Sequence, residues 1–181
     1  VHKKAADLLA SCVNDMVQAV GIDKEADNLD LYGGVGLFTS ALAGRVGKDL
    51  RMTSVESFRQ ATDDATLNLS DLPKVKAVCA PVERFLNEKV GNLDKGGKTA
   101  SPRNSTIVLD PPRAGAGAKV VDQLMKIAPK HIVYVACDPI ALARDLKQFL
   151  AGDYQLKELR AFDLFPHTHH VECVASLVRK S

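Results

Sequence analysis

Three glycines gather at one turn near the start of the chain, in the segment Asp30-Leu31-Tyr32-Gly33-Gly34-Val35-Gly36. Apolar residues precede the turn and an amphipathic run follows it, so the pattern predicts a strand, a tight turn and a helix. Glycine lets the backbone bend sharply and approach a ligand closely. A dinucleotide fingerprint would require another glycine where Thr39 stands. Its absence favours a methyl donor over NAD, and a turn that binds no ligand is the alternative.

An acidic residue, Glu56, ends the predicted strand Met52-Thr53-Ser54-Val55, twenty residues after Gly36. A carboxylate at that place can accept hydrogen bonds from both ribose hydroxyls of a nucleoside. The alternative is a helix-entry carboxylate that the positive end of the helix dipole stabilises. The glycine turn upstream favours the ribose-binding interpretation.

A second acidic residue, Asp110, is followed by Pro111 and Pro112 and comes after the apolar run 106–109. Two prolines fix the backbone and withhold hydrogen-bond donors, so the strand must stop there and present Asp110 at its carboxyl end. A carboxylate held in this way can orient a substrate or a cofactor. Prolines also end strands for structural reasons alone.

Cys137 and Glu172 are the two candidates for covalent and acid–base chemistry. Cys137 stands between an apolar run and the helix start at Asp138-Pro139, a position that can lower a thiol pKa and make the sulfur nucleophilic. The alternative is a small buried apolar side chain. Glu172 has apolar neighbours in the chain, and loss of water around a carboxylate raises its pKa towards values useful to a general base. The nearby histidines of 167–170 can instead be turn residues that face solvent.

The elements that would position these residues alternate between short strands and amphipathic helices. We expect strands at 28–32, 51–56, 74–80, 106–110, 132–136, 154–162 and 171–179. We expect helices at 4–20, 36–46, 58–69, 82–89, 119–128 and 140–150, and a polar surface loop at 91–104. The last two strands have only a short connection and must pair antiparallel, because parallel pairing needs a long crossover. The sequence therefore predicts an α/β fold with a mostly parallel sheet and a C-terminal antiparallel hairpin, the layout of Rossmann-like methyltransferases.

Composition narrows the class of protein. A length of 181 residues fits one domain, and 46% hydrophobic with 25% charged residues is typical of a soluble globular protein. The sequence contains no membrane-length apolar run and no secretory signal. Its four cysteines include no C-x-x-C pair, which argues against a disulfide framework and a metal site and favours the reducing cytoplasm.

The net charge is only +2. Proteins that bind nucleic acid by themselves usually carry a clear basic excess, because binding releases counterions from the phosphates. We therefore expect the chain alone to bind RNA poorly, unless a basic face or an additional domain supplies the affinity.

Taken in order, the motifs resemble those of the uridine-5 RNA methyltransferase (m5U) family, which makes ribothymidine in tRNA and rRNA. The family's markers are Asp-Pro-Pro-Arg-x-Gly, a Cys two residues before Pro with a later Ala-Arg-Asp, and Phe-Pro-x-Thr-x-His-Val-Glu. They stand here as Asp110 to Gly115, Cys137-Asp138-Pro139 with Ala143-Arg144-Asp145, and Phe165 to Glu172. The resemblance implies that residues 1–181 are the catalytic domain and that an RNA-binding domain would precede them.

The resemblance also implies roles for single residues. Cys137 would be the nucleophile and Glu172 the general base in a covalent reaction at carbon 5 of a uridine in tRNA or rRNA. S-adenosylmethionine would be the cofactor. The implied cofactor-binding residues are Asp30, Tyr32, Gly34, Gly36, Glu56 and Asp110.

Departures from the family pattern leave alternatives open. The family often has Ser and Asn beside the cysteine where this chain has Ala136 and Asp138, and Gln where His167 stands. The segment 80–83 lacks the early acidic residue that commonly lies near the adenine, so the adenine contacts are unassigned. One alternative is a module that keeps the fold without catalysis. Another is a methyltransferase acting on nitrogen, which would use Asp110-Pro111-Pro112 and need no cysteine.

Overall fold

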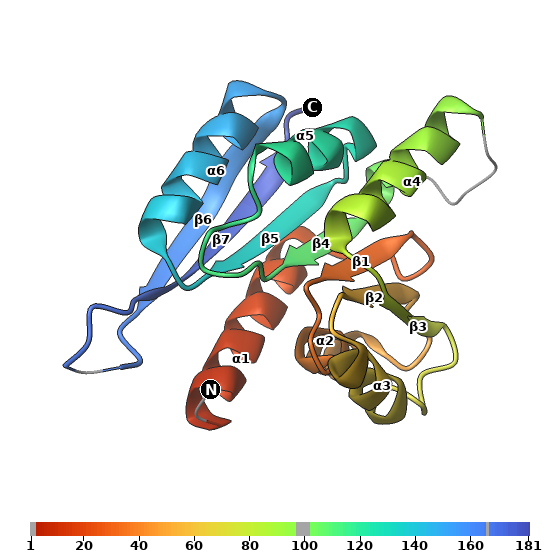
Figure 1. Ribbon diagram of the computed structural model, residues 1–181, viewed down its shortest axis with the longest axis horizontal. Coiled ribbons are helices and arrows are strands. Elements are labelled where there is room, and N and C mark those ends of the chain that lie inside the picture. Colours follow the sequence, from red (N-terminus) through yellow and green to blue (C-terminus); the bar gives the residue numbers. More distant parts are fainter. Residues whose placement is uncertain (1–2, 97–101, 166) are drawn as a thin grey trace.

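The computed structural model describes residues 3–96, 102–165 and 167–181. One seven-stranded sheet forms the centre, in the order β3-β2-β1-β4-β5-β7-β6 (Figure 1). The strands are β1 (Asn28–Leu31), β2 (Met52–Glu56), β3 (Val75–Cys79), β4 (Thr106–Leu109), β5 (His131–Ala136), β6 (Tyr154–Phe162) and β7 (Glu172–Arg179). The helices are α1 (Lys3–Val20), α2 (Leu37–Val46), α3 (Arg59–Asn68), α4 (Val82–Asp94), α5 (Ala118–Ile127) and α6 (Pro139–Ala151).

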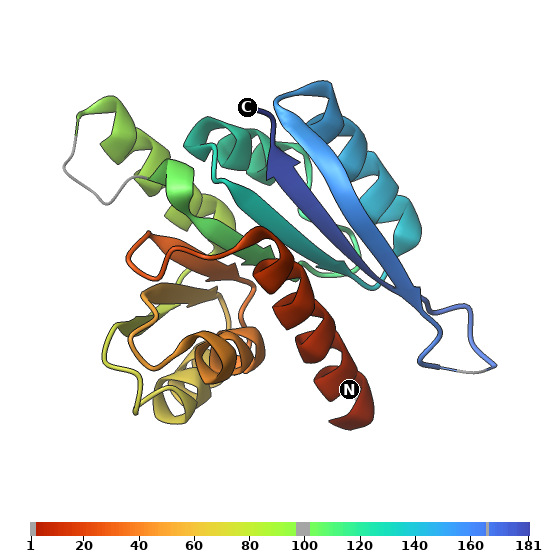
Figure 2. The same ribbon diagram turned by 180° about the vertical axis from the view of Figure 1, so that it is seen from behind.

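Helices cover both faces of the sheet. Helices α1, α2 and α3 lie over one face, and α4, α5 and α6 lie over the other (Figures 1 and 2). The side chains of each group pack with their face of the sheet in one apolar cluster. Strands β1, β4 and β5 lie between these layers and are buried along their whole length. Burial on both faces explains why β4 and β5 are mostly apolar runs that do not alternate. Strand β1 alternates in sequence, and its polar residues Asn28 and Asp30 are buried with hydrogen bonds to the Thr106 amide and to Thr39.

The strand order reverses in the middle of the sheet. Strand β1 pairs in parallel with β2 on one side and with β4 on the other, so the chain winds outwards from the centre in both directions. Strand β7 inserts between β5 and β6 and is antiparallel to both. The predicted fold class, a mostly parallel α/β sheet with an antiparallel C-terminal hairpin, is confirmed.

The largest difference from the expected elements is the length of α4. This helix continues to Asp94, whereas the sequence pattern predicted its end at Lys89 and a loop from residue 91. Gly91 lies inside the helix, although a glycine there costs about 1 kcal/mol relative to alanine. Val90 and Leu93 pack against the apolar cluster on that face, and this burial extends the helix. Residues 102–104 form a 3-10 turn, and residues 97–101 lie outside the described part of the chain.

No helix in the described ranges is both long enough and apolar enough to span a bilayer.

The central strand provides a test of this packing. Leu109 is fully buried in β4, so Leu109→Ala should lower the free energy of unfolding by about 2–5 kcal/mol through the lost contacts and the cavity left behind. Urea denaturation measures the change. Leu67→Ala is the control, because that side chain is 74% exposed and its truncation should have little effect. Equal effects of the two substitutions would contradict the described layering.

Candidate functional site

Four of the residues singled out in the sequence follow parallel strands at the same edge of the sheet. Tyr32 follows β1, Glu56 ends β2, Asp110 follows β4 and Cys137 follows β5. Because the strands are parallel, their carboxyl ends meet there, and open α/β sheets bind ligands at that edge. The edge is next to the place where the strand order reverses, between β1 and β4.

Strand β7 adds Glu172 to the same edge from the opposite direction. It runs antiparallel to β5, so its first residue lies where β5 ends. The register pairs Ala136 with Cys173, and Cys137 and Glu172 are the next residues beyond that pair on their two strands. Two residues 35 positions apart in sequence (172 − 137) thus become neighbours.

A cavity of about 170 Å³ lies between these side chains. Its lining residues are Ala5, Leu9, Asp110, Val135, Cys137, Leu164, Phe165 and Glu172. The structure thus brings together in one pocket three residues that the sequence analysis considered separately: Cys137, Glu172 and Asp110. The pocket combines a thiol and two carboxylates with apolar walls, a suitable setting for proton and covalent chemistry.

The carboxylates of this pocket have raised pKa values. Burial, reinforced by the negative charges of Asp30 and Glu172, raises the pKa of Asp110 to about 7. Burial also raises the pKa of Glu172, and the nearby His170 partly opposes this shift. The raised pKa of Glu172 agrees with the expectation from its apolar neighbours in the sequence. Asp110 can therefore take up or release a proton near neutral pH, and the pKa of Glu172 is shifted in the same direction.

The expectation of a lowered thiol pKa at Cys137 is wrong. Burial raises the pKa of Cys137, and the charges of Glu172, Asp110 and Asp138 add to the shift. The helix N-terminus does not compensate, because Asp138 caps it: its Oδ1 accepts hydrogen bonds from the amides of Ile140 (2.9 Å) and Ala141 (3.0 Å). The donors that could have stabilised a thiolate are thus already bound to a carboxylate.

The glycine turn and Glu56 form a second part of the site. The Gly34 amide donates to Oε2 of Glu56 (3.1 Å), and the Phe58 amide donates to Oε1 (2.9 Å). These two bonds orient the carboxylate, and the Glu56 residue remains partly exposed to solvent. The turn and the acidic residue, 22 positions apart, are therefore one hydrogen-bonded unit.

Backbone geometry explains the glycines of the turn. Gly34 and Gly36 have φ values of 55° and 92°, in the left-handed region that glycine adopts readily. Gly33 is restricted by space, because an added Cβ would lie 2.1 Å from Oγ of Ser54. Tyr32 also has a positive φ, 59°. Its half-buried ring packs against the core, and burial raises the pKa of its hydroxyl to about 12.

Asp30 lies behind the turn. Its side chain is fully buried, and its Oδ2 accepts hydrogen bonds from the Thr39 amide (3.2 Å) and the Thr39 hydroxyl (2.7 Å). Burial raises its pKa to about 6. Through Oδ2 the carboxylate holds the start of α2 against β1, whereas Oδ1 has no hydrogen-bond partner within the described residues. A direct contact of Asp30 with a cofactor stays a prediction.

Asp145 is an important residue whose contacts the sequence analysis did not foresee. Its buried Oδ2 accepts hydrogen bonds from the Tyr134 hydroxyl (2.6 Å) and the Ala116 amide (2.9 Å). Arg144, the neighbouring residue, donates to the carbonyl of Ala114 (2.6 Å). The loop after Asp110 is thereby fastened to α6 and β5. The signal in the sequence was an acidic residue on the apolar face of the helix, which burial permits only with strong partners.

Among the described residues, no group of three His, Cys, Asp or Glu side chains is placed to hold a metal ion.

Comparison with known proteins identifies the family. The sequence profile of the tRNA (uracil-5-)-methyltransferase family matches residues 8–180. The chain belongs to this family. It is 47% identical over 177 residues to an uncharacterized RNA methyltransferase of Streptomyces avermitilis, and 38% identical over 156 residues to one of Thermotoga maritima. The first alignment covers 98% of this chain and 38% of its relative; the second covers 83% and 32%.

Solved structures of similar shape include one from the same class. The tRNA (uracil-54, C5)-methyltransferase of Pyrococcus abyssi, solved with S-adenosyl-L-homocysteine, superimposes with a TM-score of 0.72 at 31% identity, over 96% of this chain and 38% of that one. The N-methyltransferase NodS of Bradyrhizobium japonicum has the same TM-score at 12% identity and covers 100% of both chains. The second likeness concerns the fold alone.

The raised pKa of Asp110 predicts a pH-dependent stability. Its pKa is about 7 in the folded chain and near 3.8 in the unfolded chain, so folding favours the protonated form. The stability that this carboxyl group contributes is complete below pH 3.8 and is lost as the pH rises through 7, by at most about 1.4 kcal/mol per pH unit. Asp110→Asn should therefore gain stability relative to the wild type as the pH rises from about 4 to about 7, and the difference should level off above pH 7.

Urea denaturation at intervals of pH measures this difference. The exposed Asp63→Asn is the matched control and should show no comparable trend. A constant difference between wild type and Asp110→Asn over that range would contradict the buried, charge-repelled position of Asp110.

Proposed function

We propose that this chain is the catalytic domain of an RNA methyltransferase that transfers a methyl group from S-adenosylmethionine to carbon 5 of a uridine. The observation that carries the proposal is the meeting of Cys137, Glu172 and Asp110 in one pocket at the carboxyl edge of the sheet. Membership of the tRNA (uracil-5-)-methyltransferase family supports it independently. The proposed substrate is a uridine in tRNA or rRNA, and the proposed place of action is the cytoplasm.

The site has features that suit S-adenosylmethionine. Glu56 presents an oriented, partly exposed carboxylate to which two ribose hydroxyls can donate. Gly34 has open space where a side chain would be, so the backbone can lie against a ligand. Asp110, with Asp30 and Glu172 close enough to raise its pKa, makes this edge acidic, which favours a cationic sulfonium. When bound, the cofactor supplies an electrophilic methyl group.

In the proposed reaction, Cys137 makes carbon 5 of uracil reactive. That carbon alone is a poor nucleophile. After the thiol has lost its proton, the Cys137 sulfur attacks carbon 6, and the electrons of the 5,6 double bond move to the carbonyl at carbon 4 as an enolate. The electrons would then return through carbon 5, which would take the methyl group that the bound cofactor supplies, and the cofactor would leave as a neutral thioether.

Glu172 completes the proposed cycle. It removes the remaining proton from carbon 5, the 5,6 double bond re-forms and the bond between carbon 6 and the Cys137 sulfur breaks. A general base needs a pKa close to the working pH, and burial shifts the pKa of Glu172 in that direction. Its place opposite Cys137 lets both side chains contact a single pyrimidine ring.

The raised pKa of Cys137 fits a site that is completed by its ligands. The carboxylates around the sulfur oppose a thiolate in the free protein. A cation bound near Asp110 would offset these charges and favour the thiolate where it is needed. This account keeps the nucleophile protonated until the methyl donor is present.

Cofactor binding can be measured by calorimetry. We expect S-adenosylhomocysteine to bind in preference to NAD, because the turn lacks the dinucleotide glycine and Glu56 is placed for a ribose. Glu56→Ala should weaken binding by about 1–3 kcal/mol, the range for lost hydrogen bonds to a charged acceptor. Glu88→Ala on α4 is the control and should bind normally. Preference for NAD would overturn the cofactor assignment, and unchanged affinity of Glu56→Ala would remove Glu56 from the site.

The covalent step can be trapped with RNA that contains 5-fluorouridine, because fluorine at carbon 5 blocks the final proton removal. Wild type with S-adenosylmethionine should form an adduct visible by mass spectrometry, and Cys137→Ala should form none. Cys79→Ala is the matched control and should still form it. Glu172→Gln should accumulate adduct even on ordinary uridine RNA, because methyl transfer proceeds and release stalls; Glu158→Gln on β6 should not.

Methylation rates, adduct trapping and cofactor binding together separate the competing functions. Methylation by Cys137→Ser at the wild-type rate would indicate a nitrogen-directed enzyme that uses Asp110-Pro111-Pro112. Binding of S-adenosylhomocysteine without methylation or adduct would indicate a module that has kept the fold and lost catalysis.

A further inference from the structure

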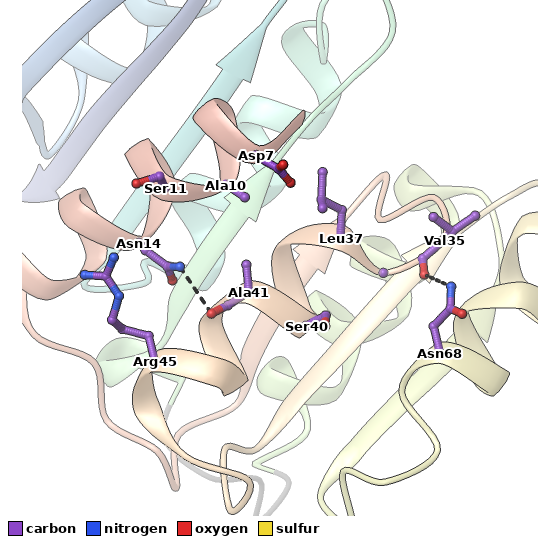
Figure 3. A pocket seen from close by; sticks show the side chains of 11 residues that line it. Asp7, Ala10, Ser11, Asn14, Val35, Leu37, Ser40, Ala41, Arg45 and Asn68 are labelled. Atoms are coloured by element: carbon purple, nitrogen blue, oxygen red, sulfur yellow. Dashed lines mark hydrogen bonds between the residues drawn. The ribbon is translucent and has the colours of Figure 1, made fainter. Parts of the chain in front are cut away.

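A second and larger cavity lies on the other side of α1 from the catalytic pocket. It is a groove between α1 and α2 with a volume of about 620 Å³, within the range of small-molecule sites (Figure 3). Ala5 and Leu9 of α1 line the catalytic pocket, whereas Ala10 and Asn14 line the groove. One helix therefore separates the two, and the distance across an α-helix is about 10–12 Å.

The groove contains a buried acceptor without a partner. Asn14 is only 8% exposed, and its Nδ2 donates to the Ala41 carbonyl (3.2 Å), as Figure 3 shows. That bond fixes the orientation of the amide, because the opposite orientation would set two oxygens against each other. Oδ1 then has no hydrogen-bond partner within the described chain. A buried unpaired acceptor costs about 1–3 kcal/mol, which a donor on a ligand would recover.

The remaining walls combine apolar and polar groups. Val35 and Leu37, beside the glycine turn, are 47% and 37% exposed and border the groove. Asp7 adds a second acceptor, and Ser40 adds a hydroxyl group. Arg45 also lines the groove, and its guanidinium contacts Asp15 (3.4 Å) and Gln18 (3.1 Å). Both contacts are exposed and such contacts are worth little in water, so the guanidinium can turn to a phosphate.

We propose that this groove binds a second base of the RNA substrate, one that carries an exocyclic amino group. The inference rests on the proposed function, because the catalytic pocket across α1 would hold the target uridine of the same strand. Adenine, cytosine and guanine each offer amino protons to Asn14 Oδ1, while the ring covers the exposed apolar side chains. Uracil fits less well, because carbonyl oxygens flank its only ring donor and would face the acceptors.

The test uses short single-stranded RNAs with one central 5-fluorouridine, at low salt and with S-adenosylmethionine. At each flanking position the nucleotide is in turn abasic, uridine, cytidine, adenosine or guanosine. The rate of adduct formation is measured with RNA below saturation. At one position, the abasic site and uridine should lower the wild-type rate about three- to tenfold relative to an amino-bearing base, the effect of one lost hydrogen bond.

Two variants assign that dependence to the groove. Asn14→Leu removes the acceptor, and Ser40→Phe fills the groove from an exposed position on α2 without changing a buried residue. In both, the dependence on the flanking base should disappear. Lys126→Phe, on α5 across the sheet, is the control and should retain it.

Each outcome bears on a different statement. An adduct that forms equally fast with every flanking base, or a base dependence that persists in Ser40→Phe, overturns the second base site and leaves the proposed function intact. No adduct with any of these RNAs overturns the proposed function and, with it, the second base site.

Discussion

The antiparallel pairing of β7 with β5 determines the geometry of the whole catalytic edge. All other neighbours of the central strands run parallel, and parallel strands bring only their carboxyl ends to this edge. A strand inserted in the opposite direction brings its first residue instead. Glu172 can thus face Cys137 across one rung of the sheet, which no parallel strand in that place would allow. Strand β7 pairs with both β5 and β6, and this pairing on both sides holds the register that places Glu172 opposite Cys137.

The second constraint is electrostatic. Asp30, Asp110 and Glu172 lie at one end of the sheet, and burial raises the pKa of each. Such an arrangement costs stability in the free protein, because charges taken from water need partners. Proteins accept this cost at sites where a ligand supplies the opposite charge. A cationic methyl donor is the ligand that the proposed function provides, and the raised pKa of the Cys137 thiol has the same cause as the acidity of the edge.

Hydrogen bonds from outside the pocket keep its loops in place. Asp145 joins the loop after β4 to α6 and to Tyr134, and Asp30 joins β1 to the beginning of α2 through Thr39. Both carboxylates are buried. Asp145 accepts hydrogen bonds from the Tyr134 hydroxyl and the Ala116 amide, whereas Asp30 accepts both of its bonds from Thr39 through Oδ2, and its Oδ1 has no partner within the described residues. The residues with direct chemical roles in the proposal therefore stand on a rigid support.

The sequence by itself determined the fold class and the strand-end positions of the chemical residues. Periodicity separates strands from helices, and prolines or glycines mark where each strand such as 106–109 must stop. It also indicated that Glu172 lies in apolar surroundings. Only the tertiary structure decided the direction of the pKa shift of the Cys137 thiol, the length of α4, and the hydrogen-bond partners of Asp30 and Asp145. These depend on neighbours distant in sequence: desolvation and Coulomb interactions are set by how closely buried groups approach one another in space, and no local pattern of residues contains that distance.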